Sequence, residues 1–202
     1  MKTCFVIGAG EFFEDSLDVR SGDMVIAADG GYVHLEKLGI VPDLIMGDFD
    51  SSEKPEFPNI AVFNSEKDDT DTGLCVEYGL ENGFRDFRIY AGYGGRFDHT
   101  FANIQTLVKI AKVGGRGFIF GKDVVLTVIS SEIEFDESFS GMISVFSVGD
   151  RAEGVCEEGL KYSLDKATLT NDFPLGVSNE FTGKRAKISV KEGFLLIVYE
   201  RQ

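Results

Sequence analysis

Two aspartates one residue apart are the residues in this sequence best placed to do chemistry. The segment PDLIMGDFDS at 42–51 is a short apolar run followed by Asp48 and Asp50. Alternate side chains of an extended backbone lie on the same side, so these two carboxylates share a face. Oxygen ligands of this kind suit Mg²⁺, which uses one or two carboxylates and completes its shell with water and substrate phosphate. The competing interpretation is that Asp48 caps a turn and Asp50 is solvated.

Asp71, in the segment KDDTD at 67–71, is a third candidate carboxylate. A helix is expected to begin at Thr72 and to stop at Gly83. Asp71 directly precedes this helix, at the position of an N-cap residue. Capping the helix and binding a metal are both open to Asp71, and one carboxylate could do both.

The segment GGRFDH at 94–99 offers a second kind of chemistry. Arg96 presents a planar fork of donors to phosphate oxygens, and the neighbouring glycines let backbone amides approach an anion. Asp98 and His99 are proton-handling candidates, although a helix N-cap and a turn histidine are alternative roles. The sequence contains no Walker A motif, so a P-loop enzyme is excluded.

These residues follow short apolar runs that predict strands of a mostly parallel sheet. Runs at 4–7, 24–28, 44–46, 61–63, 87–91 and 117–120 alternate with helical patterns, such as 32–38 and the series Phe101, Ile104, Val108 and Ala111. This alternation is typical of an α/β fold, in which ligands bind beyond the carboxyl ends of the strands. The candidates should therefore gather at one sheet edge. His34, in the first helix, is expected to be solvated.

The pattern changes after about residue 122. Runs at 124–129, 142–146, 186–190 and 195–199 read as strands separated by turn residues, without helical periodicity. We therefore predict an N-terminal mostly parallel α/β sheet domain at 1–122, followed by a small C-terminal all-β sandwich domain at 123–202.

Composition narrows the class of partner. The net charge of −14 argues against a nucleic-acid surface but suits a cationic small molecule. No apolar run is long enough to span a membrane, and the residues before Gly8 are too few for a signal peptide. The 3 cysteines are widely spaced, as in a reducing compartment. A cytoplasmic protein is expected.

Six segments together resemble the thiamine pyrophosphokinase family. They are AADGG at 27–31, PDLIMGDFDS at 42–51, KDDTD at 67–71, GGRFDH at 94–99, GLKY at 159–162 and GVSNE at 176–180. The resemblance covers nearly the whole chain. It implies an ATP-binding α/β domain, a thiamine-binding sandwich, and a homodimer whose active sites are shared between subunits.

The resemblance also implies roles for individual residues. Asp48, Asp50 and Asp71 would bind Mg²⁺, and Asp71, Arg96 and Asp98 would be catalytic. Nucleotide contacts are expected from Gly30, Lys67, Thr70, Arg96 and His99, and thiamine contacts from Ser178 and Asn179. The family often places a tryptophan near thiamine, but this chain has 0 tryptophans. Tyr162 or Phe181 would have to supply the aromatic face.

The expected reaction is attack of the thiamine hydroxyl on the β-phosphorus of ATP, releasing AMP. Either Asp71 or Asp98 would accept the hydroxyl proton. Two other interpretations remain open at this point. One is a transferase that binds a nucleotide-sugar through a metal at Asp48 and Asp50, which leaves the C-terminal half unexplained. The other is a sensor that binds thiamine or a nucleotide without turnover.

Overall fold

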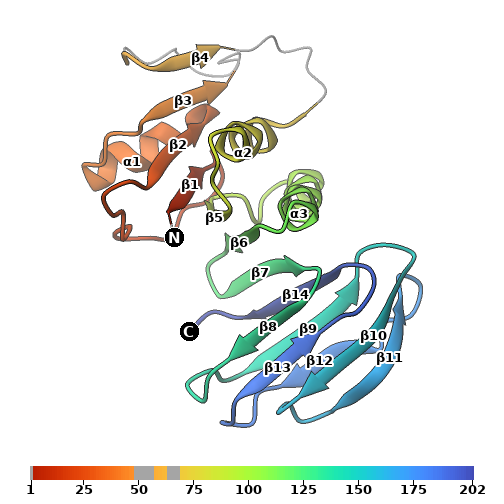
Figure 1. The fold of residues 1–202 in the computed structure, drawn as a ribbon. Helices are drawn as coiled ribbons and strands as arrows, with labels where there is room; N and C mark the ends of the chain where they lie inside the picture. Colours follow the sequence, from red (N-terminus) through yellow and green to blue (C-terminus); the bar gives the residue numbers. More distant parts are fainter. Residues whose placement is uncertain (1, 48–56, 63–68) are drawn as a thin grey trace. The chain divides into compact units, whose positions relative to one another are not determined.

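The structure is a computed structural model, which describes residues 2–47, 57–62 and 69–202 (Figure 1). The described chain divides into two compact units. The first unit extends to Thr106 and includes Gly117–Lys122, whereas the second comprises Leu107–Arg116 and Asp123–Gln202. Helix α3 (Phe97–Lys112) contributes residues to both.

The first unit is built on a sheet with the strand order β6-β5-β1-β2-β3-β4. Strand β1 pairs in parallel with β2 and β5, and β3 pairs in parallel with β2 and β4. The parallel sheet predicted from the alternating pattern is therefore confirmed. The strands are β1 (Thr3–Ile7), β2 (Met24–Ala28), β3 (Leu44–Gly47), β4 (Ile60–Val62), β5 (Asp86–Tyr90) and β6 (Arg116–Phe120).

Helices cover both faces of this sheet. Leu35 of α1 (Tyr32–Leu38) belongs to a buried cluster with Phe5 of β1. Gly79 of α2 (Asp71–Glu81) lies against the other face, because a Cβ atom there would stand 3.0 Å from the sulfur of Cys4. Cys4 and Phe5 are consecutive in a strand and so point to opposite faces. Burial on both faces explains why these strands read as nearly continuous apolar runs.

The second unit is a β-sandwich. One sheet has the order β12-β9-β14-β7 and the other β11-β10-β13-β8, and neighbouring strands within each are antiparallel. Phe135 of one sheet meets Tyr199 of the other with ring centroids 5.1 Å apart. The strands are β7 (Val124–Ile129), β8 (Glu132–Phe135), β9 (Met142–Ser147), β10 (Arg151–Glu158), β11 (Leu164–Thr170), β12 (Gly176–Glu180), β13 (Ala186–Ser189) and β14 (Leu195–Glu200).

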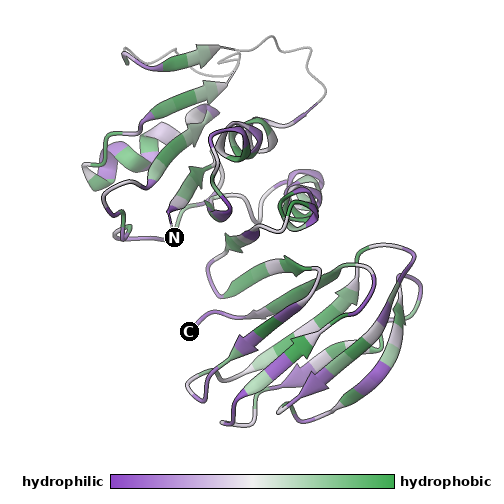
Figure 2. Ribbon diagram, viewed as in Figure 1, coloured by the Kyte–Doolittle hydropathy of each residue, from purple (hydrophilic) through white to green (hydrophobic). Residues whose placement is uncertain are grey.

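The predicted sandwich is thus confirmed, but strands β8, β10, β11 and β12 were absent from the predicted set. They carry charged or polar residues at many positions, so hydropathy alternates along the sandwich strands, whereas β1 to β3 are more uniformly apolar (Figure 2). A strand with one solvated face gives a weaker apolar signal than a strand buried on both faces.

Two local predictions were wrong. The N-cap of α2 is Thr70 rather than Asp71, because the Thr70 hydroxyl accepts a hydrogen bond from the Gly73 amide at 3.0 Å. His34 is only partly exposed: its Nε2 lies 2.9 Å from the Gly10 carbonyl oxygen, and its ring stacks on Phe12.

Candidate active site

The loops that follow β1, β2 and β5 meet at the carboxyl edge of the first unit's sheet. The amide of Gly8 donates to the Tyr90 carbonyl at 2.9 Å, and that of Gly10 donates to the Ala91 carbonyl at 3.2 Å. Gly31 also lies against the end of β1, since a Cβ atom there would stand 1.9 Å from the Ile7 carbonyl oxygen. The close backbone contacts confirm that these loops gather at one edge, as the parallel topology predicted.

Two residues at this edge have an unusual backbone. Asp29, directly after β2, has a φ of 49°, and Ala91, directly after β5, has a φ of 53°. A left-handed conformation costs a residue with a Cβ atom roughly 1–2 kcal/mol, so surrounding contacts must hold it. Such conformations concentrate at functional sites. Gly30, a candidate nucleotide contact, lies between Asp29 and Gly31 in a short 3-10 helix.

The glycine-rich loop after β5 is held from beneath by two polar residues of α3. The hydroxyl of Thr100 accepts from the Gly94 amide at 3.1 Å, and the side-chain amide of Asn103 donates to the Gly92 carbonyl at 2.8 Å. Both residues are buried. Our sequence reasoning missed them, although polar residues one turn apart, directly after GGRFDH, are a signal that could have indicated loop support.

Arg96 and Asp98 follow this loop and are exposed. The Arg96 Nε donates to Asp98 Oδ1 at 3.2 Å, and its Nη2 donates to Asp98 Oδ2 at 2.6 Å. The hydrogen bond from Arg96 is the main reason that the pKa of Asp98 lies below its usual range. His99 is also exposed, in the first turn of α3. The guanidinium fork is therefore open to solvent, where a phosphate could compete with Asp98.

The start of α2 carries the described part of the KDDTD segment. The Asp69 carboxylate accepts from the Thr70 amide at 2.8 Å. It also lies over the first helical turn, because a Cβ atom at Gly73 would stand 2.2 Å from an Asp69 oxygen. Asp71 is the first residue of the helix.

The predicted metal site is only partly covered by the structure. Asp48, Asp50 and Lys67 lie outside the described residues. Among the described residues, no group of three or more His, Cys, Asp or Glu side chains could hold a metal ion. Asp71 by itself is therefore not a metal site, and a complete set of ligands requires other residues.

The predicted thiamine residues lie in the second unit. Ser178, on β12, is exposed and has a φ of 61°, in a stretch where the pairing of β12 with β9 is irregular between Gly176 and Asn179. Its amide donates to the Ser144 hydroxyl at 3.1 Å. Strain of this kind in an exposed segment again marks a candidate functional site.

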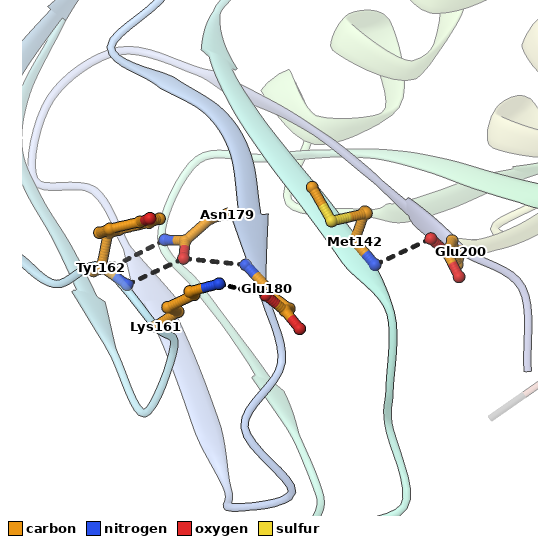
Figure 3. A network of polar contacts seen from close by, with 6 residues as sticks. All are labelled: Met142, Lys161, Tyr162, Asn179, Glu180 and Glu200. Carbon is orange, nitrogen blue, oxygen red and sulfur yellow. Dashed lines mark hydrogen bonds and ion pairs between the residues drawn. The ribbon is translucent and has the colours of Figure 1, made fainter.

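Asn179 is buried and bridges two segments of the chain (Figure 3). Its Oδ1 accepts from the amides of Tyr162 at 3.0 Å and Glu180 at 2.9 Å. Its Nδ2 donates to the Tyr162 carbonyl at 2.7 Å. Asn179 thus fastens GLKY to GVSNE, the two motifs of the second unit that carry the resemblance.

The two candidate aromatic residues differ in accessibility. Phe181 is 6% exposed and packs edge-on against Phe135 with centroids 5.1 Å apart. Tyr162 is 62% exposed. In this unit, Tyr162 therefore offers a ring face to a ligand, whereas Phe181 is part of the core.

Comparison with known sequences gives the family. The sequence model of the thiamin pyrophosphokinase catalytic domain matches residues 18–116, and that of the thiamin pyrophosphokinase vitamin B1 binding domain matches residues 130–195. The chain is 31% identical over 183 residues to a thiamine pyrophosphokinase of Bacillus subtilis, covering 86% of this chain and 85% of that protein. The chain belongs to the thiamine pyrophosphokinase family.

Solved structures agree with this assignment. A crystal structure of thiamine pyrophosphokinase from Bacillus subtilis superposes with a TM-score of 0.87 at 26% identity, covering 100% of both chains. A thiamin pyrophosphokinase from Geobacillus thermodenitrificans gives 0.84 at 26% identity, covering 99% of this chain and 98% of that one. The family, the enzyme class and the α/β-plus-sandwich fold predicted from the motifs are therefore confirmed.

Proposed function

We propose that this enzyme transfers pyrophosphate from ATP to the hydroxyl of thiamine in a Mg²⁺-dependent reaction, giving thiamine diphosphate and AMP. The observation that carries the proposal is the presence of both family domains in one chain, at 18–116 and 130–195. The strained strand-end loops of the first unit support a phosphate site, and the exposed Tyr162 and Ser178 support a site for an organic cation.

The first unit would bind ATP. Arg96 can give two parallel hydrogen bonds to phosphate oxygens, and the glycine-rich loop before it presents backbone amides to an anion. Thr100 and Asn103 keep that loop in place. Gly30, Lys67, Thr70 and His99 are the further nucleotide contacts that we propose.

Mg²⁺ suits the proposed donor set, because carboxylate oxygens are its preferred protein ligands. Asp48, Asp50 and Asp71 would hold the ion. The position of Asp71 fits this role. Asp71 is the first residue of α2, and the two residues before it, Asp69 and Thr70, are held by hydrogen bonds at the helix start. When bound, the ion would supply positive charge to the transferring phosphates.

The second unit would bind thiamine. Tyr162 can stack on an aromatic ring of the substrate, and Ser178 can hydrogen-bond to it. The side-chain amide of Asn179 is hydrogen-bonded to backbone groups of Tyr162 and Glu180. We therefore propose that Asn179 serves the substrate by holding Ser178 and Tyr162, rather than by donating to the substrate from its side chain.

A side chain of the protein must also accept the proton of the thiamine hydroxyl. Asp71 and Asp98 are the two candidate acceptors. Arg96 opposes protonation of Asp98 while the two are paired, because a hydrogen-bonded cation favours the charged carboxylate. Asp71 is therefore the better candidate as long as that pair persists.

We further propose a cytoplasmic homodimer in which each active site combines the first unit of one chain with the second unit of its partner. The family resemblance supports this arrangement. A two-fold dimer would contain two equivalent sites. The location is consistent with the 3 cysteines, which form no disulfide bond. No helix in the described residues is long and apolar enough to cross a membrane.

One assay tests the proposed function. Purified protein is incubated with ATP, Mg²⁺ and thiamine, and the products are separated by chromatography. We expect AMP and thiamine diphosphate in equal amounts. ADP with thiamine monophosphate would contradict transfer of the whole pyrophosphate group. Binding of thiamine without any turnover would instead favour a sensor.

A further inference from the structure

A buried carboxylate stands behind the Asn179 bridge. Glu157 of β10 is 1% exposed, and its Oε2 accepts from Asn179 Nδ2 at 2.7 Å. Its Oε1 has no hydrogen-bond partner in the part of the chain that the structure describes. A buried polar atom without a partner destabilises the folded state, so a purely structural role would be served better by an apolar side chain.

The direction of this hydrogen bond follows from the neighbours of Asn179. Its Oδ1 lies between two backbone amides, those of Tyr162 and Glu180, which can only donate. Its Nδ2 lies near the Tyr162 carbonyl, which can only accept. The side-chain amide therefore has one orientation, and Glu157 Oε2 must be the acceptor of the remaining N–H. With Glu157 in place, the side-chain amide of Asn179 makes four hydrogen bonds.

Asn179 is linked to both exposed residues of the proposed thiamine site: Ser178 precedes it in the chain, and Tyr162 is hydrogen-bonded to it. Ser178, next to Asn179, has a left-handed backbone that it would not adopt unaided. Tyr162 is bonded through both its backbone amide and its carbonyl. A rotation of the Asn179 side chain would therefore disturb both residues together. Glu157 opposes that rotation from the interior.

We propose that Glu157 is a positioning residue for the substrate: by fixing the Asn179 side chain, it sets the relative placement of Ser178 and Tyr162. This inference rests on the proposed function, because it assumes that these two exposed residues contact thiamine. Glu157 is itself too deeply buried to touch the substrate. Its effect on binding is indirect.

Two substitutions separate the hydrogen bond from the volume of the side chain. Glu157→Gln keeps a carbonyl oxygen that can accept from Asn179, so the KM for thiamine should stay within about twofold of the parent. Glu157→Leu has a similar volume but no acceptor. Loss of a hydrogen bond to a charged group should raise the KM for thiamine about tenfold or more, with the KM for ATP unchanged.

A matched control distinguishes a general loss of stability from a specific loss of thiamine binding. Leu169→Ala, in β11 of the same sandwich, opens the core at a residue that is 2% exposed. Melting temperatures are measured for all variants, together with thiamine affinity by titration calorimetry without ATP. An equal rise in thiamine KM in Leu169→Ala and Glu157→Leu, at equal loss of melting temperature, would overturn the proposal. Unchanged thiamine binding in Glu157→Leu would overturn it as well.

A second pair of variants keeps the test decisive if Glu157→Leu does not fold. Asn179→Asp keeps the oxygen between the two amides but sets a second carboxylate against Glu157. The double variant Glu157→Gln with Asn179→Asp restores a hydrogen bond in the opposite direction. We expect thiamine affinity to be weaker in Asn179→Asp than in the double variant; additive effects would contradict the proposal. A parent protein that neither binds nor converts thiamine would overturn the proposed function and this inference together.

Discussion

The ammonium nitrogen of Lys161 lies 5.9 Å from the centre of the Tyr162 ring. The same nitrogen is held by Glu180 at 2.7 Å, so the cation is fixed over the ring by a neighbouring strand (Figure 3). The face of an aromatic ring attracts cations, and Tyr162 is still 62% exposed to solvent with Lys161 in this position. Thiamine carries a positive charge on one of its rings, and Tyr162 is the aromatic contact that we propose for it.

The first prediction concerns this ring. Tyr162→Leu should raise the KM for thiamine about threefold to tenfold, the range expected for loss of one aromatic pair. Tyr162→Phe and Tyr162→Trp, which keep a ring, should bind thiamine as the parent does. Phe181→Leu is the control: it should lower the melting temperature without a selective change in thiamine KM. Equal thiamine KM values for Tyr162→Leu and the parent would rule out stacking on this residue.

The second prediction concerns Arg96. Arg96→Lys keeps the charge but loses the fork, so kcat/KM for ATP should fall about tenfold to a hundredfold. Arg20→Lys is a matched control, because Arg20 is also exposed and paired with an aspartate two residues away, Asp18. It should have no effect on steady-state kinetics. An Arg96→Lys enzyme with parental turnover and ATP KM would exclude a bidentate phosphate contact.

The third prediction separates the two candidate proton acceptors. Loss of a general base lowers kcat by roughly 10²–10⁴-fold. We expect Asp71→Asn to show such a loss, and Asp98→Asn to change mainly the KM for ATP by releasing Arg96. Steady-state kinetics at saturating Mg²⁺ give both parameters. The reverse pattern, with kcat lost only in Asp98→Asn, would assign the proton to Asp98.

The fourth prediction concerns the shared site. Asp50→Asn should abolish metal-dependent turnover, and Ser178→Trp should block the thiamine site, so each variant alone should be inactive. In a mixed dimer one site would carry both changes and the other neither, so activity should return to roughly half of the parent level per mixed dimer. Mass spectrometry of tagged chains verifies subunit exchange. Exchange without recovered activity would mean that each chain builds its own site.

The fifth prediction is a pH dependence of stability caused by Glu157. Burial raises the pKa of this carboxyl, and the hydrogen bond from Asn179 opposes the rise. A raised folded-state pKa gives a stabilising contribution that is complete below the unfolded value of about 4.3 and is lost as pH rises through the folded value.

Glu157→Gln removes this titration. The melting temperature of the variant relative to the parent should therefore increase from pH 4 upward and then level off above the folded-state pKa. Leu169→Ala, which changes no ionisable group, should shift the melting temperature by a similar amount across the range. A constant difference between Glu157→Gln and the parent at every pH would contradict the raised pKa.

The sequence was sufficient for the architecture where strands are buried on both faces. The runs that became β1, β2 and β3 are continuously apolar, and the glycines and aspartates that follow them mark the strand ends. In the sandwich, β10 and β11 carry several charged or polar residues and were missed. One solvated face leaves a pattern too weak to separate a strand from a loop.

Choices between competing side chains depended on the tertiary structure. The sequence places both Tyr162 and Phe181 near the motifs of the second unit, but only packing against Phe135 removes Phe181 from consideration. Asp is a stronger N-cap than Thr by residue type, but the geometry of the first turn places Thr70 at the cap instead of Asp71. Glu157 has no local signal at all. Its partner Asn179 is 22 residues away, and the sandwich fold joins them. The sequence alone determines which residue types stand in each motif, whereas burial and long-range pairing arise only when distant segments pack together.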